Sequence, residues 1–272
     1  MDIVLVGAGR LAIQLGSALQ ARGHRITAVF SRTMSSAVSL AQLLDADATD
    51  DVNRLPLQAD AFILSVKDSA LTNLIPSLSK GRQQQYFFHT AGSMPMSVFR
   101  NSVEHCGEQQ CGIDHCSLEH YGVIYPMQTF SKERKVDFSR VHIFIEGSDE
   151  LALGRARAIA TSVSNQVSEL SSDKRRYLHL AAVFACNFSN HCYSLAATIL
   201  EEQGLDFKSM LPLIAETAAK VETMHPLQAQ TGPAIRFDKN VINAHLQLLD
   251  GHPRLQELYS LMTNSIHDNA PF

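Results

Sequence analysis

Residues 179–196, HLAAVFACNFSNHCYSLA, form an apolar run that predicts a buried helix, yet it carries side chains able to do acid–base chemistry. An imidazole can give or take a proton near neutral pH, and a carboxamide can orient a carbonyl, an imine or an amide. On an ideal helix, which turns about 100° per residue, His179, Asn187, Asn190 and His191 fall on one face. We therefore predict that His191, Asn187 and Asn190 are catalytic. His179, about 12 Å before Asn187 along such a helix, is a further substrate-binding candidate. Buried hydrogen bonds between helices are the alternative explanation of these polar residues.

A second polar segment, QTGPAIRFD at 230–238, supplies further candidates. Its Gly-Pro pair interrupts a helix, and Asp238 is a suitable N-cap for the helix that follows. An arginine suits a carboxylate or a phosphate. We predict that Thr231 and Arg236 bind the substrate, although Arg236 could instead pair with Asp238.

A glycine-rich segment, GAGRLA at 7–12, follows a short aliphatic run and opens a helical pattern. This context is what the G-x-G-x-x-G/A motif requires for binding a dinucleotide pyrophosphate at a helix N-terminus. A turn without a ligand is the alternative. The predicted cofactor-binding residues of this segment are Gly7, Ala8, Gly9, Arg10 and Leu11.

The second expected strand ends in FSRT, residues 30–33, and carries no acid. Folds specific for NAD usually have an Asp or Glu here for the ribose 2′-hydroxyl, whereas an arginine suits the 2′-phosphate of NADP. Ser31, Arg32 and Thr33 therefore predict NADP(H) as the cofactor. The alternative is that Arg32 is a solvated loop residue.

Two further strand ends should lie at the same edge of the sheet, because ligands of open α/β sheets bind beyond the carboxyl ends of the strands. Ser65 and Val66 end one strand, and the segment HTAGS at 89–93 ends the next. We place Ser65, Val66, His89 and Gly92 on the nicotinamide side. His89 could equally be a hydrogen-bonded histidine at the end of a strand.

The elements that position these residues alternate between strands and helices over the first 171 residues. Aliphatic and aromatic runs predict strands at 3–6, 25–30, 60–66, 85–89, 121–126, 141–147 and 166–170. Such alternation predicts an α/β fold with a doubly wound parallel sheet, a Rossmann domain over 1–171. Residues 172–272 predict helices alone, at about 172–203, 206–224, 238–249 and 253–268.

Composition limits the possible partners. The 272 residues carry a net charge of −4, and 45% of them are hydrophobic, which favours neither nucleic acid nor an anionic membrane as a partner. No apolar run is long enough to span a bilayer, and the N-terminal residues form a strand pattern rather than a signal peptide. We therefore expect a cytoplasmic protein.

The spacing of the cysteines does not favour a metal site. Cys106, Cys111 and Cys116 recur among histidines, but not at the spacing of structural zinc sites, so we predict no metal and a solvated connecting segment. Cys186 and Cys192 lie within the apolar run and are expected to be small core residues.

Four segments together resemble a known family: HTAGS at 89–93, YGVIYPMQTFS at 121–131, HLAAVFACNFSNH at 179–191 and TGPAIR at 231–236. With GAGRLA and FSRT, they resemble Rossmann-like NADP oxidoreductases whose C-terminal half is a helical domain of unknown function. These proteins are related to deazaflavin-dependent NADP reductases and pyrroline-5-carboxylate reductases.

The resemblance implies a Rossmann domain followed by an all-α, 6-phosphogluconate-dehydrogenase-like domain that mediates dimerisation, with a cleft between the two. It implies no particular substrate. Related reductases of hydroxyacids and ketopantoate use a helical K-x-x-x-N motif. If Asn187 matches its asparagine, the lysine position is Val183, so a histidine or a water held by the asparagines must replace the lysine.

These observations lead to one preferred function and two competitors. We expect an NADP-dependent oxidoreductase that acts on a C=O or C=N group of a small, anionic substrate, as a homodimer. The first competitor is an NADP-binding sensor or scaffold without turnover. The second is a homodimer whose polar stripe is only an interface.

Overall fold

The computed structural model describes residues 1–104 and 118–270 of the chain. The described chain divides into two compact units, Met1–Asn190 and His191–Phe272. The last strand ends at Glu169, close to the boundary predicted near residue 171. The division into domains at this residue stays a prediction. No helix of the described residues is long and apolar enough to cross a membrane.

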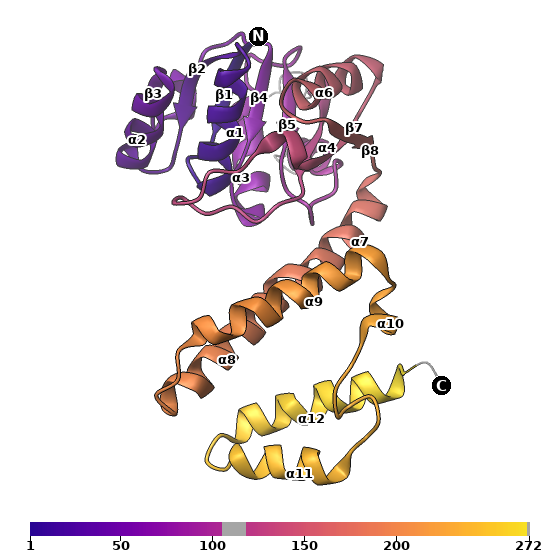
Figure 1. The fold of residues 1–272 in the computed structure, drawn as a ribbon. Coiled ribbons are helices and arrows are strands. Elements are labelled where there is room, and N and C mark those ends of the chain that lie inside the picture. Colours follow the sequence, from indigo (N-terminus) through magenta and orange to yellow (C-terminus); the bar gives the residue numbers. More distant parts are fainter. Residues whose placement is uncertain (105–117, 271–272) are drawn as a thin grey trace. The chain divides into compact units, whose positions relative to one another are not determined.

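The first unit is built on one sheet of eight strands in the order β3-β2-β1-β4-β5-β6-β7-β8 (Figure 1). All neighbouring strands are parallel except β6 and β7, which are antiparallel. The predicted doubly wound sheet is confirmed, and the expectation that it is parallel throughout is wrong at this one pair. The strands are β1 Asp2–Val6, β2 Arg25–Phe30, β3 Asp47–Thr49, β4 Ala61–Leu64, β5 Tyr86–His89, β6 His120–Pro126, β7 His142–Gly147 and β8 Gln166–Glu169.

Helices cover both faces of this sheet, and the alternation of side chains along each strand explains why. In β1, Ile3 and Leu5 pack into a core shared with α1, α2 and α6, whereas Val4 and Val6 pack into a second core shared with α3 and α4. Both cores consist of fully or nearly fully buried aliphatic and aromatic side chains. The helices of this layer are α1 Arg10–Ala21, α2 Met34–Leu44, α3 Asp68–Ser79, α4 Val98–Glu104 and α6 Glu150–Val163.

The helical region begins directly after β8, as the sequence predicts. The expected single helix over 172–203 is interrupted by a π-helical turn at Val183–Phe188, where the Ser189 hydroxyl donates to the Phe184 carbonyl at 3.2 Å. The helices and this turn are α7 Ser172–Ala182, the π-turn Val183–Phe188, α8 Ser189–Glu202, α9 Leu211–Thr223, α10 Pro226–Ala229, α11 Lys239–Leu248 and α12 Pro253–Asp268.

The second unit buries few side chains within one copy of the chain. Among residues 191–270, Ile242, Leu249 and Thr263 are the buried ones. In the π-turn, which belongs to the first unit, Phe184 and Phe188 are 62% and 50% exposed. The expectation that this apolar run is buried is therefore wrong for a single chain. Several large apolar side chains of this unit are exposed in the described chain, among them Leu213 and Leu248.

The two cysteines of this run are not buried either, contrary to the expectation that they are core residues. Cys186 is exposed and Cys192 is partly exposed. They are not core residues within one copy of the chain, because the helix that carries them lies outside both cores of the sheet.

Candidate active site

The turn between β1 and α1 has room for a ligand at its second glycine and no room for a side chain at its first. Gly7 has φ +115°, and a Cβ there would lie 2.3 Å from the carbonyl oxygen of Ser65. At Gly9, by contrast, a Cβ would meet nothing within 4 Å. Gly9, the N-cap of α1, and Arg10, its first residue, are both exposed, so the positive end of this helix is accessible. Ala12 is fully buried, as the close packing of helix on strand requires. This cradle fits a pyrophosphate.

The segment after β2 presents a cation beside the start of α2. Arg32 is exposed and forms no ion pair or hydrogen bond with the described residues. The Ser31 amide donates to the Thr49 carbonyl at 3.1 Å, and the Thr33 hydroxyl donates to Ser36 at 2.8 Å. Arg32 is thus free to bind a 2′-phosphate. The other interpretation, that Arg32 is a solvated loop residue, is also compatible with this geometry.

The ends of β1, β4 and β5 are linked to one another. The Ser65 amide donates to the Val6 carbonyl at 2.8 Å, and the Thr90 hydroxyl donates to the Ser65 hydroxyl at 3.3 Å. The Val66 side chain lies 3.1 Å from the Cβ position of Gly7. Ser65 and Val66 therefore lie at the glycine turn, at the edge where the sequence places them.

His89 lies inside the fold rather than on its surface. Its side chain is fully buried, its ring stacks on Phe99, and Nδ1 accepts a hydrogen bond from the Ala91 amide at 3.2 Å. Nε2 is buried without a hydrogen-bond partner among the described residues. Burial lowers the pKa of His89 to about 3, and the positive charge of Arg175 adds to this shift. The imidazole is therefore neutral. A cofactor-binding role for His89 stays a prediction. The ring is buried, so its position does not support direct contact with a cofactor.

Gly92, Tyr125 and His179 meet beyond the ends of β5 and β6. The Tyr125 hydroxyl lies 3.1 Å from Nδ1 of His179. A Cβ on Gly92 would lie 2.6 Å from that same Nδ1 and 2.8 Å from Cζ of Tyr125. Only a glycine therefore lets the main chain after β5 approach this pair so closely. Three of the segments that the sequence singled out, HTAGS, YGVIYPMQTFS and HLAAVFACNFSNH, are brought together here.

A buried ion pair supports the base of α7 next to this site. Arg175 is fully buried, and its Nη1 lies 2.6 Å from Oε2 of Glu146 on β7. Nη2 donates to the Met94 carbonyl at 2.8 Å and to the Ser172 hydroxyl at 3.1 Å. Both Glu146 oxygens accept hydrogen bonds from Ser172, at 2.9 Å from its amide and 2.7 Å from its hydroxyl. This network fixes the first turn of the helix that carries His179.

The same network affects the Tyr125 phenol. Burial raises the pKa of Tyr125, the positive charge of Arg175 opposes this shift, and the Cys186 thiol adds to it. Burial dominates, so the phenol keeps its proton at neutral pH. Tyr125, Arg175 and Glu146 were not among the sequence-based candidates. For Tyr125 the only signal was its place in YGVIYPMQTFS, and for the other two the sequence held no signal.

The π-turn changes the face on which the other helical candidates lie. A π-turn adds one residue to a helical turn, so it rotates everything after it by about 100° relative to a continuous α-helix. The common face derived for His179 and Asn190 therefore does not hold. Asn187 and His191 are exposed, and neither forms a hydrogen bond or an ion pair with the described residues. Asn187, Asn190 and His191 stay predictions as catalytic residues.

The segment around Gly232 belongs to the second unit. Asp238 caps α11 by accepting a hydrogen bond from the Val241 amide at 3.4 Å, as the sequence predicts. Arg236 is exposed and, within the described chain, forms no ion pair with Asp238. Thr231 and Arg236 stay predictions as substrate ligands.

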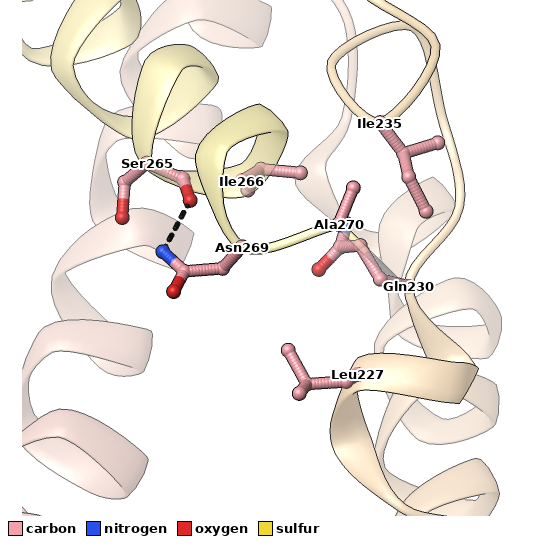
Figure 2. Close-up of a pocket in the computed structure, with 7 residues that line it drawn as sticks. All are labelled: Leu227, Gln230, Ile235, Ser265, Ile266, Asn269 and Ala270. Carbon is pink, nitrogen blue, oxygen red and sulfur yellow. Dashed lines mark hydrogen bonds between the residues drawn. The ribbon is translucent and has the colours of Figure 1, made fainter. Parts of the chain in front are cut away.

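A small pocket lies beside this segment (Figure 2). Its volume is about 250 Å³, and on one side Asn269 donates a hydrogen bond to the Ser265 carbonyl one turn earlier at the end of α12, at 2.8 Å. Neither Thr231 nor Arg236 lines this pocket. The lining residues are Leu227, Gln230, Ile235, Ser265, Ile266, Asn269 and Ala270.

A metal centre receives no support from residues 1–104 and 118–270. They contain no group of three or more His, Cys, Asp or Glu side chains placed to hold an ion. Cys106, Cys111 and Cys116 lie outside the described residues.

Comparisons with known proteins agree with this geometry. Residues 2–87 match the family described as NADP oxidoreductase, coenzyme F420-dependent, and residues 141–266 match a domain of unknown function, DUF2520. The class is therefore that of the Rossmann-type NADP oxidoreductases. A Bacteroides fragilis protein provisionally described as an NADP oxidoreductase is 47% identical, with 98% of each chain covered and a TM-score of 0.88. The chain belongs to the same family of NADP oxidoreductases.

More distant solved structures share the fold. A Myxococcus stipitatus imine reductase in complex with NADP⁺ is 17% identical, covering 98% of this chain and 93% of its own, with a TM-score of 0.69. A Streptococcus pyogenes 1-pyrroline-5-carboxylate reductase is 13% identical, covering 98% of each chain, with a TM-score of 0.61. No curated protein matches the chain.

Proposed function

We propose that this NADP oxidoreductase reduces a C=O or C=N group of a small, anionic substrate at the carboxyl ends of β5 and β6. The observation that carries this proposal is the Tyr125–His179 pair, packed against the main chain of Gly92. The pair lies beyond the ends of β5 and β6. The open cradle at Gly9 follows β1, which belongs to the same sheet. Ligands of open α/β sheets bind at this edge.

The chemistry divides between the cofactor and the protein. When bound, NADPH supplies the hydride. The glycine turn would hold its pyrophosphate, and Arg32 with Ser31 and Thr33 would hold its 2′-phosphate. Ser65, Val66 and the main chain of Gly92 would line the nicotinamide side.

The substrate class rests on two arguments. Imine reductases and pyrroline-5-carboxylate reductases share the fold, and their names point to C=N groups and, in the second case, to a carboxylate. Arg236 is a free cation that suits a carboxylate. From the sequence, Asn187 and Asn190 would orient the substrate and Thr231 would bind it, with His191 proposed for proton transfer.

We also propose that the protein is a homodimer formed through its helices. A unit of about 80 residues with three buried side chains has too small a core to be stable alone. Its exposed apolar side chains, such as Leu213 at 62% and Leu248 at 81%, are typical of an interface. Sedimentation equilibrium tests this proposal, and a monomer at micromolar concentration would contradict it.

The function is tested by binding first and turnover second. We expect NADPH to bind more tightly than NADH, measured by nicotinamide fluorescence, since the chain has no tryptophan to interfere. Oxidation of NADPH is then followed with 1-pyrroline-5-carboxylate, 2-methyl-1-pyrroline and small 2-oxo acids. Reduction of at least one compound supports an enzyme. Tight NADPH binding without turnover on any compound would favour the alternative, a sensor or scaffold.

A further inference from the structure

We propose that His179, held in one orientation by Tyr125, gives the proton that completes the reduction. This inference rests on the proposed function and assigns the proton transfer to His179 rather than to His191. Hydride addition to a C=O or C=N group leaves an electron pair on oxygen or nitrogen, and that atom needs a proton from a positioned group.

The two histidines differ in what holds them. Nδ1 of His179 lies 3.1 Å from the Tyr125 hydroxyl and rests on Gly92. The Tyr125 and His179 rings meet edge to face, with 6.0 Å between their centroids. His191 is exposed, and no residue of the described chain orients its ring. A general acid must be within hydrogen-bond reach of the atom that it protonates, so a fixed ring is the better candidate.

Tyr125 acts as a positioning residue that suits both protonation states of His179. Tyr125 is only 8% exposed and neutral, so its hydroxyl can donate to a bare Nδ1 or accept from a protonated Nδ1. In both states Nδ1 is engaged. Nε2 has no partner in the described part of the chain and is left to exchange a proton with the substrate. His179 is partly exposed, so a small molecule can reach it.

Two groups with ionisable side chains act on the Tyr125 phenol beside His179. Arg175 is the nearby cation that acts on both Tyr125 and His89, and its charge is balanced by Glu146 at 2.6 Å. The other titratable neighbour of the pair is Cys186, whose thiol acts on Tyr125.

The proton transfer completes the reduction of a C=X group, in which X is the oxygen or nitrogen of the substrate. The substrate carbon accepts the hydride and its two electrons, and the π pair of the C=X bond moves onto X. X takes the proton from Nε2 of protonated His179, whose N–H pair stays on the ring. The products are the reduced substrate, NADP⁺ and neutral His179, which solvent protonates again. Tyr125 keeps its own proton throughout.

The test uses His179→Gln and Tyr125→Phe in the full-length protein, with a matched pair as control. Nδ1 of His245 lies 2.9 Å from the Tyr259 hydroxyl in the second unit, so His245→Gln and Tyr259→Phe remove a similar contact elsewhere. We expect the first two variants to lower kcat about 100-fold or more, while the NADPH Kd stays within about threefold. The control pair should keep wild-type turnover. Added imidazole should restore part of the turnover of His179→Ala.

A measurement on the free protein tests the positioning role of Tyr125. In ¹⁵N-histidine NMR spectra, His179→Gln identifies the signal of this ring among the 12 histidines. We expect neutral His179 to carry its proton on Nε2, and Tyr125→Phe to convert it to a mixture of tautomers. A merely structural tyrosine would leave the tautomer unchanged, and that result would overturn its positioning role.

Two results would overturn the assignment of His179. One is wild-type kcat in His179→Gln. The other is a loss of turnover in His191→Gln that His179→Gln does not show. If the wild-type protein binds NADPH but reduces no compound of the panel, the proposed function fails, and the proton transfer fails with it. The NMR result still decides whether Tyr125 holds the ring.

Discussion

Arg175 and Glu146 form a buried ion pair, with Nη1 2.6 Å from Oε2, that joins the first turn of α7 to strand β7. Arg175 has no exposed surface, and Nε is buried without a partner among the described residues. A buried charge is tolerated only when it is paired and hydrogen-bonded. The position of α7, and with it that of His179, therefore depends on this pair.

Removing either partner should destabilise the protein. We expect Glu146→Gln to lower the free energy of unfolding by about 3–5 kcal/mol, because it leaves the buried Arg175 charge uncompensated. Arg175→Met should lower it by less, because the Glu146 carboxylate is partly exposed. Urea denaturation measures this change. The double variant Arg175→Met with Glu146→Leu is the control, and it should recover part of the loss. A double variant as unstable as the sum of the singles would contradict the coupling.

Substitutions at Gly7 and Gly9, in the turn between β1 and α1, should have separate effects on the stability of the protein and on NADPH binding. Gly7→Ala should lower the free energy of unfolding by about 1–3 kcal/mol, because φ is +115° and the new Cβ would lie 2.3 Å from a carbonyl oxygen. Gly9→Ala should cost less than about 1 kcal/mol, since its Cβ meets no atom. It should nevertheless weaken NADPH binding at least about tenfold, because the methyl group enters the space of the pyrophosphate.

Urea denaturation and nicotinamide fluorescence measure these two effects. A Gly9→Ala variant that binds NADPH as the wild-type protein does would show that the pyrophosphate lies elsewhere.

The sequence predicted the sheet well because each buried strand is a short run of aliphatic and aromatic residues. It missed β3, Asp47–Thr49, which is three residues long and has no aliphatic side chain larger than alanine. It also missed that β7 runs antiparallel, because a hydrophobic run does not specify the direction of a strand. Strand existence is encoded locally, whereas pairing depends on the connections between strands.

The site was harder to predict for the same reason. Tyr125 and His179 are 54 residues apart in the chain, and their contact depends on β6, α7 and Gly92 together. The π-turn at Val183–Phe188 changes the hydrogen-bond register without any change in composition, so angles computed for an ideal helix fail beyond it. The apolar pattern of residues 179–196 predicted a buried helix, whereas Phe184 and Phe188 are 62% and 50% exposed in the described chain.

Arg32 should determine the preference for NADPH over NADH. Arg32→Gln removes the one cation in the segment after β2, so we expect NADPH affinity to fall about 10- to 100-fold, as for a lost charge-assisted hydrogen bond. NADH affinity should not change, because NADH has no 2′-phosphate. Arg22→Gln, at the opposite end of α1, is the matched control. Equal losses for both cofactors in Arg32→Gln would place this residue at the pyrophosphate instead.

His89 should make the protein less stable as the pH falls. Its folded-state pKa of about 3 lies below the ordinary value of 6.5, because burial and Arg175 disfavour the charged ring. Between these two values the unfolded chain binds more protons than the folded one, so stability rises with pH and is lost on acidification. The loss attributable to His89 approaches about 1.4 kcal/mol per pH unit. His89→Phe removes this titration while keeping a ring to stack on Phe99.

Urea denaturation at several pH values between 7 and 4.5 measures this effect as the difference between the two proteins. We expect the wild-type protein to lose more stability than His89→Phe over this range. Exposed His245, changed to Gln, serves as the control and should leave the wild-type pH dependence in place. Parallel curves for the wild-type protein and His89→Phe would show that folding does not lower the pKa of His89.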